Sequence, residues 1–201
     1  WGYVYSTFDK TYLYQGSTPV CDVGNFGKVL TYGYDINEAG QIFGHGFTAA
    51  SVQTPFVFDQ QNLLRNTGAA AGLLWIDAIN APGQILGFRG GPIVLQNADD
   101  NVGTPVGGLG GTTYARAMSD RGEVVGWSTS VITGKDSAFV KDAFGVRNLN
   151  NFIHPEGEQI PSGWWLCSAN DINQNGLIVG SMRNGHDPAR AFLLIPVDPS
   201  P

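Results

Sequence analysis

The acidic stretches of the chain are the first candidates for chemistry, because carboxylate and amide oxygens bind calcium. Residues 171–176, Asp-Ile-Asn-Gln-Asn-Gly, match the first half of an EF-hand loop. The second half fails, since Met182 stands where a bidentate Glu is required. Asp99, Asp100 and Asn101 form another acidic cluster, which we expect to be a solvated loop. We therefore predict no cofactor and no metal, with calcium as the alternative.

Motifs for catalysis are mostly missing from the sequence. The histidines His45, His154 and His186 have no His-x-x-x-His spacing that would hold a metal. There is no Gly-x-Ser-x-Gly elbow, phosphate-binding glycine loop or Cys-x-x-Cys pair. A glycosidase needs two converging carboxylates, and the 17 acidic residues favour no particular pair. We predict that the chain is not an enzyme.

Aromatic residues are the candidates for binding. Trp164 and Trp165 follow a long segment, residues 150–163, and are expected either to contact a sugar or partner or to fill the core beside it. The N-terminus is also rich in aromatic residues, which suits an interface. Its candidate interface residues are Trp1, Tyr3, Tyr5 and Tyr12.

The composition limits the class of partner. Eleven Lys and Arg against 17 Asp and Glu give a net charge of −6, and the basic residues are scattered. Nucleic acid is not expected, because phosphate binding needs a basic face. No apolar run reaches the roughly 20 residues of a transmembrane helix. The chain starts at Trp1 without a charged-then-apolar leader, so we expect a processed chain or an excised domain.

A sequence repeat must position these residues. Each of four copies has an apolar residue, Asn or Ser, two variable residues and Gly, then a β-prone pair followed by a second Gly. Asn and Gly tolerate unusual backbone angles, so each copy predicts a hairpin turn. The second glycine predicts close backbone approach, a bulge or a bend. The turn residues are Asn37 and Gly40, Asn80 and Gly83, Ser119 and Gly122, and Asn173 and Gly176.

The repeat predicts an all-β fold. A third apolar run follows each hairpin, and a weaker fourth run follows in three units, one of them at 106–109. Units of about 40 residues with four strands are typical of propeller blades, so we predict a β-propeller-like repeat of four-stranded blades. Each fourth strand could instead belong with the three strands after it. We expect one domain over residues 1–201, with four full units and a partial N-terminal unit. The approximate units are 1–27, 28–68, 69–111, 112–163 and 164–201.

The two cysteines lie near the two ends of this repeat. Cys21 falls in the last predicted strand of the partial unit, and Cys167 lies just before the first strand of the last unit. In a closed ring they would be neighbours, so we predict a disulfide, which would stabilise the fold by roughly 4 to 5 kcal/mol. The alternative is two unpaired buried thiols.

The repeat resembles that of the HAF-type extracellular repeat proteins of bacteria. Their unit consists of a hairpin of this kind, a His-Ala-Phe-Leu-Trp-like strand and an Asp-Leu-Gly-x-Leu-Gly-Gly segment. The matching parts here are residues 36–44, 137–140, 190–194 and 107–111. Many relatives are secreted, and some end in a Pro-Glu-Pro sorting tail that this chain does not show. The resemblance therefore implies a location outside the cell or on its surface.

These observations together predict a non-catalytic, secreted structural or interaction protein. The incomplete unit would leave an exposed strand edge, and such edges pair with other chains. Self-assembly into filaments or surface layers is therefore expected, with other copies or surface and matrix glycans as partners. The alternatives are an extracellular carbohydrate-binding propeller and, less favoured, a propeller glycoside hydrolase or lyase.

Overall fold

The chain divides into two compact units in the computed structural model, Trp1–Pro105 and Val106–Pro201. The predicted single domain over residues 1–201 stays a prediction. The structure describes residues 2–7, 10–15, 18–23, 27–59, 63–66, 73–97, 103–153 and 160–196. Only the backbone is described for residues 2–7, 10, 14–15, 18–22, 27–30 and 63–66.

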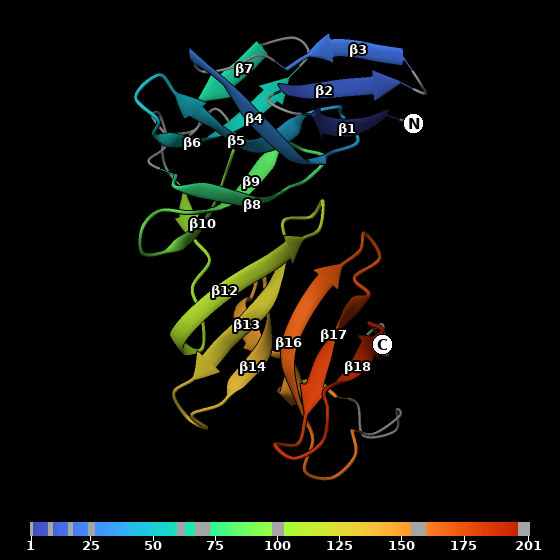
Figure 1. Cartoon of the computed structure of the whole chain (residues 1–201). Helices are drawn as coiled ribbons and strands as arrows, with labels where there is room; N and C mark the ends of the chain where they lie inside the picture. Colours follow the sequence, from blue (N-terminus) through green and yellow to red (C-terminus); the bar gives the residue numbers. More distant parts are fainter. Residues whose placement is uncertain are drawn as a thin grey trace. The chain divides into compact units, whose positions relative to one another are not determined.

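The first unit holds three antiparallel sheets, in which each strand pairs with the next along the chain (Figure 1). Sheet 1 consists of β1 (Gly2–Thr7), β2 (Lys10–Gln15) and β3 (Thr18–Asp22). Sheet 2 consists of β4 (Gly27–Ile36), β5 (Ile42–Thr48), β6 (Gln53–Asp59) and β7 (Leu63–Asn66). Sheet 3 consists of β8 (Trp75–Ile79), β9 (Gln84–Phe88), β10 (Ile93–Asn97) and β11 (Thr104–Pro105).

The second unit holds two more sheets of the same kind. Sheet 4 consists of β12 (Gly110–Met118), β13 (Val124–Ser130), β14 (Asp136–Asp142) and β15 (Gly145–Asn148). A short 3-10 helix, η1 (Leu149–Asn151), follows it. Sheet 5 consists of β16 (Trp165–Ile172), β17 (Ile178–Arg183) and β18 (Arg190–Leu194). The prediction of an all-β fold is confirmed, since the described residues form antiparallel sheets and no α-helix.

The strand pairing decides between the two predicted groupings and corrects two details of the repeat. Each fourth strand pairs with the third strand of its own unit, as β7 does with β6, so the alternative grouping is wrong. Sheet 5 has three strands among the described residues, where a full unit was expected. The fourth strand of sheet 3 is β11 rather than residues 106–109. Gly107 and Gly110 have φ of 80° and 102°, which turn the chain after β11.

Apolar side chains join the sheets of the first unit face to face. Successive strand residues point to opposite faces, so Ile42 and Phe43 of β5 enter different clusters. Sheet 2 is therefore buried on both faces. The residues between sheets 1 and 2 are Leu13, Val23, Ile42, Phe56 and Phe58. Those between sheets 2 and 3 are Phe43, Val57, Leu73, Ile76, Ile79, Ile85 and Val94.

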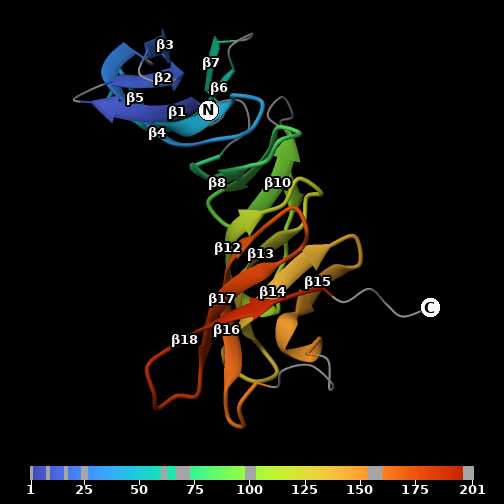
Figure 2. The ribbon, with the colours of Figure 1, turned by 90° about the vertical axis from the view of Figure 1, so that its right-hand side faces the viewer.

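Sheets 4 and 5 of the second unit pack on each other in the same way (Figure 2). Val125 of β13 and Val140 of β14 lie against sheet 5. Leu149 of η1 closes the cluster and is 4% exposed. The residues that sheet 5 contributes are Leu166, Ala169, Ile172 and Ile178.

The second glycine of each repeat copy lies where two strand backbones approach closely. Gly44 of β5 pairs with Gly33 of β4, next to a register shift. A Cβ on Gly44 would collide with the carbonyl oxygen of Tyr32. The same collision would occur at Gly126 with Tyr114 and at Gly180 with Ser168. At Gly87 the added Cβ would lie 2.8 Å from the carbonyl oxygen of Trp75. The hairpins therefore require glycine at this position.

Replacing Gly44 with alanine tests this close approach. We expect Gly44→Ala to lower the free energy of unfolding by about 1–3 kcal/mol, because the strands must move apart. The matched control is Gly91→Ala in the same unit, where an added Cβ meets nothing within 4 Å. Urea unfolding of both variants measures the difference, and equal stability of the two would contradict the explanation.

Candidate functional site

The four repeat turns share one set of hydrogen bonds. In the first turn, the Gly40 N–H donates to the Asn37 carbonyl at 3.0 Å, and Asn37 Oδ1 accepts from the Gln41 N–H at 2.8 Å. Gly40 has a φ of 77°. The other three turns repeat the first of these bonds, from Gly83 to Asn80, from Gly122 to Ser119 and from Gly176 to Asn173. The Asn or Ser side chain thus satisfies a backbone donor, and Gly supplies the left-handed backbone conformation.

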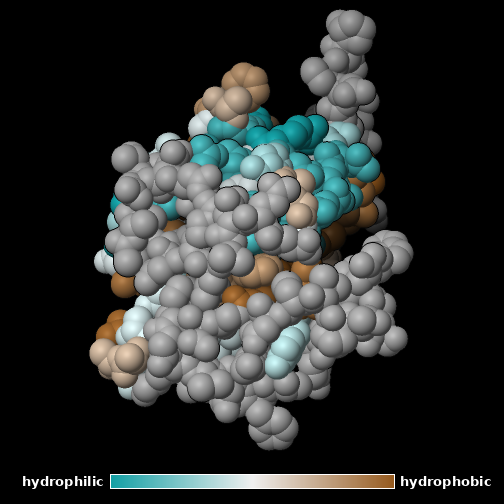
Figure 3. All heavy atoms as spheres, turned by 90° about the horizontal axis from the view of Figure 1, so that it is seen from above, coloured by the Kyte–Doolittle hydropathy of each residue, from teal (hydrophilic) through white to brown (hydrophobic). Residues whose placement is uncertain are grey.

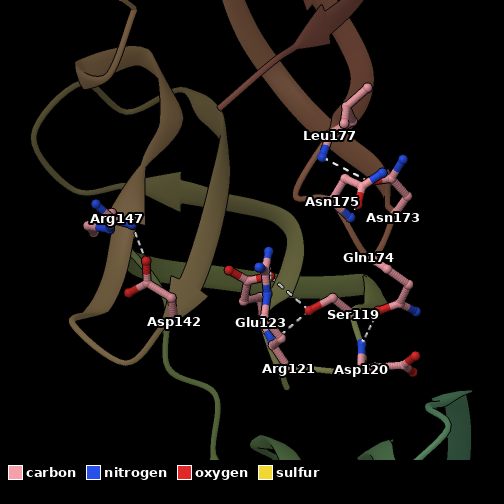
Figure 4. A network of polar contacts seen from close by, with 10 residues as sticks. All are labelled: Ser119, Asp120, Arg121, Glu123, Asp142, Arg147, Asn173, Gln174, Asn175 and Leu177. Carbon is pink, nitrogen blue, oxygen red and sulfur yellow. Dashed lines mark hydrogen bonds and ion pairs between the residues drawn. The ribbon is translucent and has the colours of Figure 1, made fainter. Parts of the chain in front are cut away.

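Polar side chains join the turns of neighbouring sheets. Asn37 Nδ2 donates to the carbonyl of Asn80 at 2.7 Å, which links sheets 2 and 3. In the second unit, the Asp120 N–H donates to Gln174 Oε1 at 2.8 Å, which links sheets 4 and 5 (Figure 4). The turn residues therefore contribute to contacts between sheets as well as to their own hairpins.

The EF-hand-like stretch is one of these turns. Asn173 Oδ1 accepts hydrogen bonds from the N–H groups of Asn175 and Leu177, at 2.9 and 3.0 Å (Figure 4). Asp171 Oδ1 accepts from the Ile172 N–H at 2.9 Å. These oxygens serve the backbone of the hairpin. The other acidic cluster, at 99–101, lies outside the described residues.

A cleft of about 320 Å³ opens beside the turns between sheets 4 and 5. Its apolar lining includes Leu149, Ile172 and Leu194. Its four charged residues form two ion pairs, Arg121 with Glu123 at 3.2 Å and Arg147 with Asp142 (Figure 4). The buried Nε of Arg147 has no hydrogen-bond partner among the described residues. The charges of the two pairs cancel, so these groups give the cleft no net charge.

Cations cover ring faces of both candidate tryptophans. Lys135 Nζ lies 4.0 Å from the ring centroid of Trp165, and Arg190 Cζ lies 4.4 Å from that of Trp164. Trp165 Nε1 also donates to the carbonyl of Asp136 at 3.0 Å. These contacts hold the two half-buried rings in place. A ligand contact by Trp164 and Trp165 stays a prediction.

The structure places part of the aromatic N-terminus. Trp1 lies outside the described residues, and the side chains of Tyr3 and Tyr5 are not described. The backbone register sets Tyr5 of β1 opposite Tyr12 of β2. Tyr12 is half-buried and follows the buried Thr11. The register therefore brings two of the four candidate interface residues together.

The predicted disulfide is not supported by the structure. Cys167 in β16 is a buried free thiol, and its Sγ donates to the carbonyl of Ser181 at 3.1 Å. Burial is the main cause that raises the pKa of this thiol. The backbone of Cys21 belongs to β3, and the structure does not describe its side chain.

One sheet face in the second unit carries exposed apolar residues. Val179 and Leu193 pair across β17 and β18 and are 43% and 52% exposed. Ser181 and Ala191 form the next pair, and an open hollow of about 640 Å³ lies over all four. We call these four residues the outer face of sheet 5. Their apolar equivalents are buried under a following sheet, Phe43 and Val57 in sheet 2 and Val125 and Val140 in sheet 4.

Stacked aromatic pairs are a second surface feature, which the sequence pattern did not predict. Each pair joins the residue after the second repeated glycine to the residue opposite it. The pairs are Tyr32 with His45, Trp75 with Phe88 and Tyr114 with Trp127, with ring centroids 4.9, 4.3 and 4.6 Å apart. The signal was present, since a ring follows that glycine in three copies and serine follows it in the fourth. Figure 3 shows hydrophobic residues among hydrophilic ones on one face of the molecule.

The pair in sheet 2 includes His45, whose ring contacts several aromatic side chains. Phe47 meets the ring of His45 edge-on at 5.4 Å, and the Tyr34 hydroxyl is hydrogen-bonded to its Nδ1. Burial lowers the pKa of His45 below its ordinary value of 6.5. Burial and, secondarily, Tyr32 raise the pKa of Tyr34. Folding therefore shifts the equilibrium of His45 toward the neutral imidazole.

Comparisons with protein-family models and with curated proteins give no match to this chain. Among the residues that the structure describes, no helix has the length and hydropathy that crossing a bilayer requires. The same residues contain no cluster of three or more His, Cys, Asp or Glu side chains that could hold a metal ion.

The lowered pKa of His45 predicts how stability depends on pH. Above pH 6.5 the imidazole is neutral in both folded and unfolded chains. As the pH falls below that value, the unfolded chain takes up the proton first, so this contribution to stability is lost. We expect His45→Phe, which copies Phe88 of sheet 3, to weaken the fall in stability below pH 6.5. Urea unfolding between pH 5 and pH 8 measures the free energy of unfolding of the unmodified chain and of the variant. The same pH dependence in both chains would contradict the role given to His45.

Proposed function

We propose that this chain is a non-catalytic structural or interaction protein whose copies associate through the outer face of sheet 5. The observation that carries the proposal is the exposure of Val179 and Leu193, at 43% and 52%. Exposed apolar patches on a folded protein mark interaction sites. The equivalent residues of sheets 2 and 4 are buried under another sheet of the repeat, so the partner that fits this face is also a sheet of the repeat.

Sheet 1 of a second copy is the proposed partner. Its Leu13 packs on sheet 2, and Tyr12 precedes Leu13 in β2, so Tyr12 belongs to the opposite face. An amphipathic aromatic residue suits an interface. Contact between this face and the outer face of sheet 5 would join copies head to tail. Such a heterologous contact builds either closed rings or open filaments.

We further propose that the five sheets are blades of a propeller-like repeat of the HAF type, in a protein that acts outside the cell or at its surface. The support is the shared strand order of the sheets and the face-to-face burial of neighbouring sheets within each unit. Surface layers or filaments are the assemblies that repeated head-to-tail contacts would form. The Cys21–Cys167 bond is not part of the proposal, because Cys167 is free.

Charge placed on the outer face of sheet 5 tests the association. We expect Leu193→Lys to raise the dissociation constant between copies by about 10- to 100-fold. It removes a leucine side chain that association would bury, and such burial contributes about 1.5–3 kcal/mol. Sedimentation velocity over a range of concentrations measures this constant. The matched control is Ile132→Lys, which changes a residue 93% exposed outside sheet 5 and is expected to leave association unchanged. A chain that stays monomeric at high concentration would refute the proposal.

A further inference from the structure

The first strand of sheets 2 to 5 carries a β-bulge at the same place. In sheet 4, Ala115 pairs with Gly126 and Ala117 pairs with Val125, so Arg116 has no partner across the ladder. In sheets 2, 3 and 5 the strand register shifts at the equivalent place. The extra residue directly follows the first-strand residue that pairs with the second repeated glycine. The four extra residues are Tyr34, Asp77, Arg116 and Asn170, and all are exposed. Bulges commonly re-aim a side chain near a functional site.

Each bulge residue stands two positions after the first-strand member of the stacked aromatic pair. In sheet 5, the serines Ser168 and Ser181 occupy the positions of that pair. In sheet 2, the Tyr34 hydroxyl is hydrogen-bonded to Nδ1 of His45. In sheet 5, Ser168 Oγ donates to Asn170 Oδ1 at 2.8 Å. These two bonds show that the bulge side chain turns toward the pair. A polar or hydroxyl-bearing group therefore stands beside the pair in both sheets.

The rings of the pairs present open surface. The first-strand members Tyr32, Trp75 and Tyr114 are 41%, 45% and 49% exposed. Each ring stacks on its partner at interplanar angles of 16° to 29° and still keeps this exposed surface. Three independent sheets thus repeat one arrangement, an exposed ring two residues before a polar bulge residue.

We propose that each ring pair with its bulge residue binds one sugar unit of a neutral polysaccharide. The flat C–H face of a pyranose stacks on an aromatic ring, while its hydroxyl groups need polar partners at the ring edge. The bulge residues differ in charge, with Asp77 acidic, Arg116 basic and Tyr34 neutral. A hydroxyl group donates to the first and accepts from the second, whereas a charged ligand would be repelled at one of them. Repeated sites in one chain match a ligand built from repeated units.

Sheet 5 supplies the natural control for this site. Serine stands at both pair positions there, Ser168 and Ser181, and the hairpin keeps the bulge and the repeated glycine. The hairpin therefore forms without the rings. Serine substitution of an exposed ring copies a residue that the repeat already contains.

The test uses the full chain with chitohexaose, cellohexaose and xylohexaose as probes. We expect at least one hexaose to bind, and the triple variant Tyr32→Ser, Trp75→Ser and Tyr114→Ser to bind it about tenfold more weakly or not at all. Isothermal titration calorimetry measures the affinity. The control Phe144→Ser alters a ring that is 88% exposed outside the pairs and is expected to keep full affinity.

A second readout does not depend on the folding of a variant. In the unmodified chain, the bound hexaose should shift the indole N–H NMR signals of Trp75 and Trp127. Absence of binding by all three hexaoses, or shifts confined to Trp164 and Trp165, would overturn the proposal. The triple variant should also keep the self-association of the unmodified chain in sedimentation, so failure here is distinguishable from failure of the proposed assembly.

Discussion

The close approach of two strand backbones at the second repeated glycine is the constraint on which each hairpin depends. The carbonyl of Tyr32, Trp75, Tyr114 or Ser168 occupies the space of a side chain at the facing position, so only glycine fits. The same spot carries the bulge, which adds one residue to the first strand and increases its local twist. The turn before this glycine and the cross-strand pair after it are thereby held in one register in four sheets.

Burial of both faces is the second constraint. A sheet of this repeat has apolar residues on each side, as Ile42 and Phe43 show in sheet 2. A neighbour on each face stabilises such a sheet, because exposed apolar surface is unfavourable in water. Sheet 5 covers one face on sheet 4 and leaves Val179 and Leu193 exposed on the other. The proposed association would cover that face, as neighbouring sheets cover the equivalent pairs of sheets 2 and 4.

The candidate residues from the sequence had mixed outcomes. Turn residues such as Asn37 and Gly40 were predictable because their conformations are local, and the structure shows the expected positive φ at Gly40. The EF-hand-like stretch was also predicted as a repeat turn, and Asn173 Oδ1 accepts backbone N–H groups there as a turn residue does. The pair Tyr114 and Trp127 was missed, because recognising it requires the register between β12 and β13. Trp165 proved to contact Lys135, which lies in the connection between β13 and β14 of sheet 4, and no spacing reveals this contact.

The sequence by itself determined the repeat, the hairpin turns and the all-β class, because these depend on local backbone preferences and on apolar alternation within a few residues. Tertiary structure alone decided that each fourth strand joins its own unit, and that Cys167 is a free thiol. It also decided which rings stack and which apolar face stays open. These features depend on contacts between residues far apart in the chain, and such contacts are set by strand register and sheet packing rather than by neighbours in sequence.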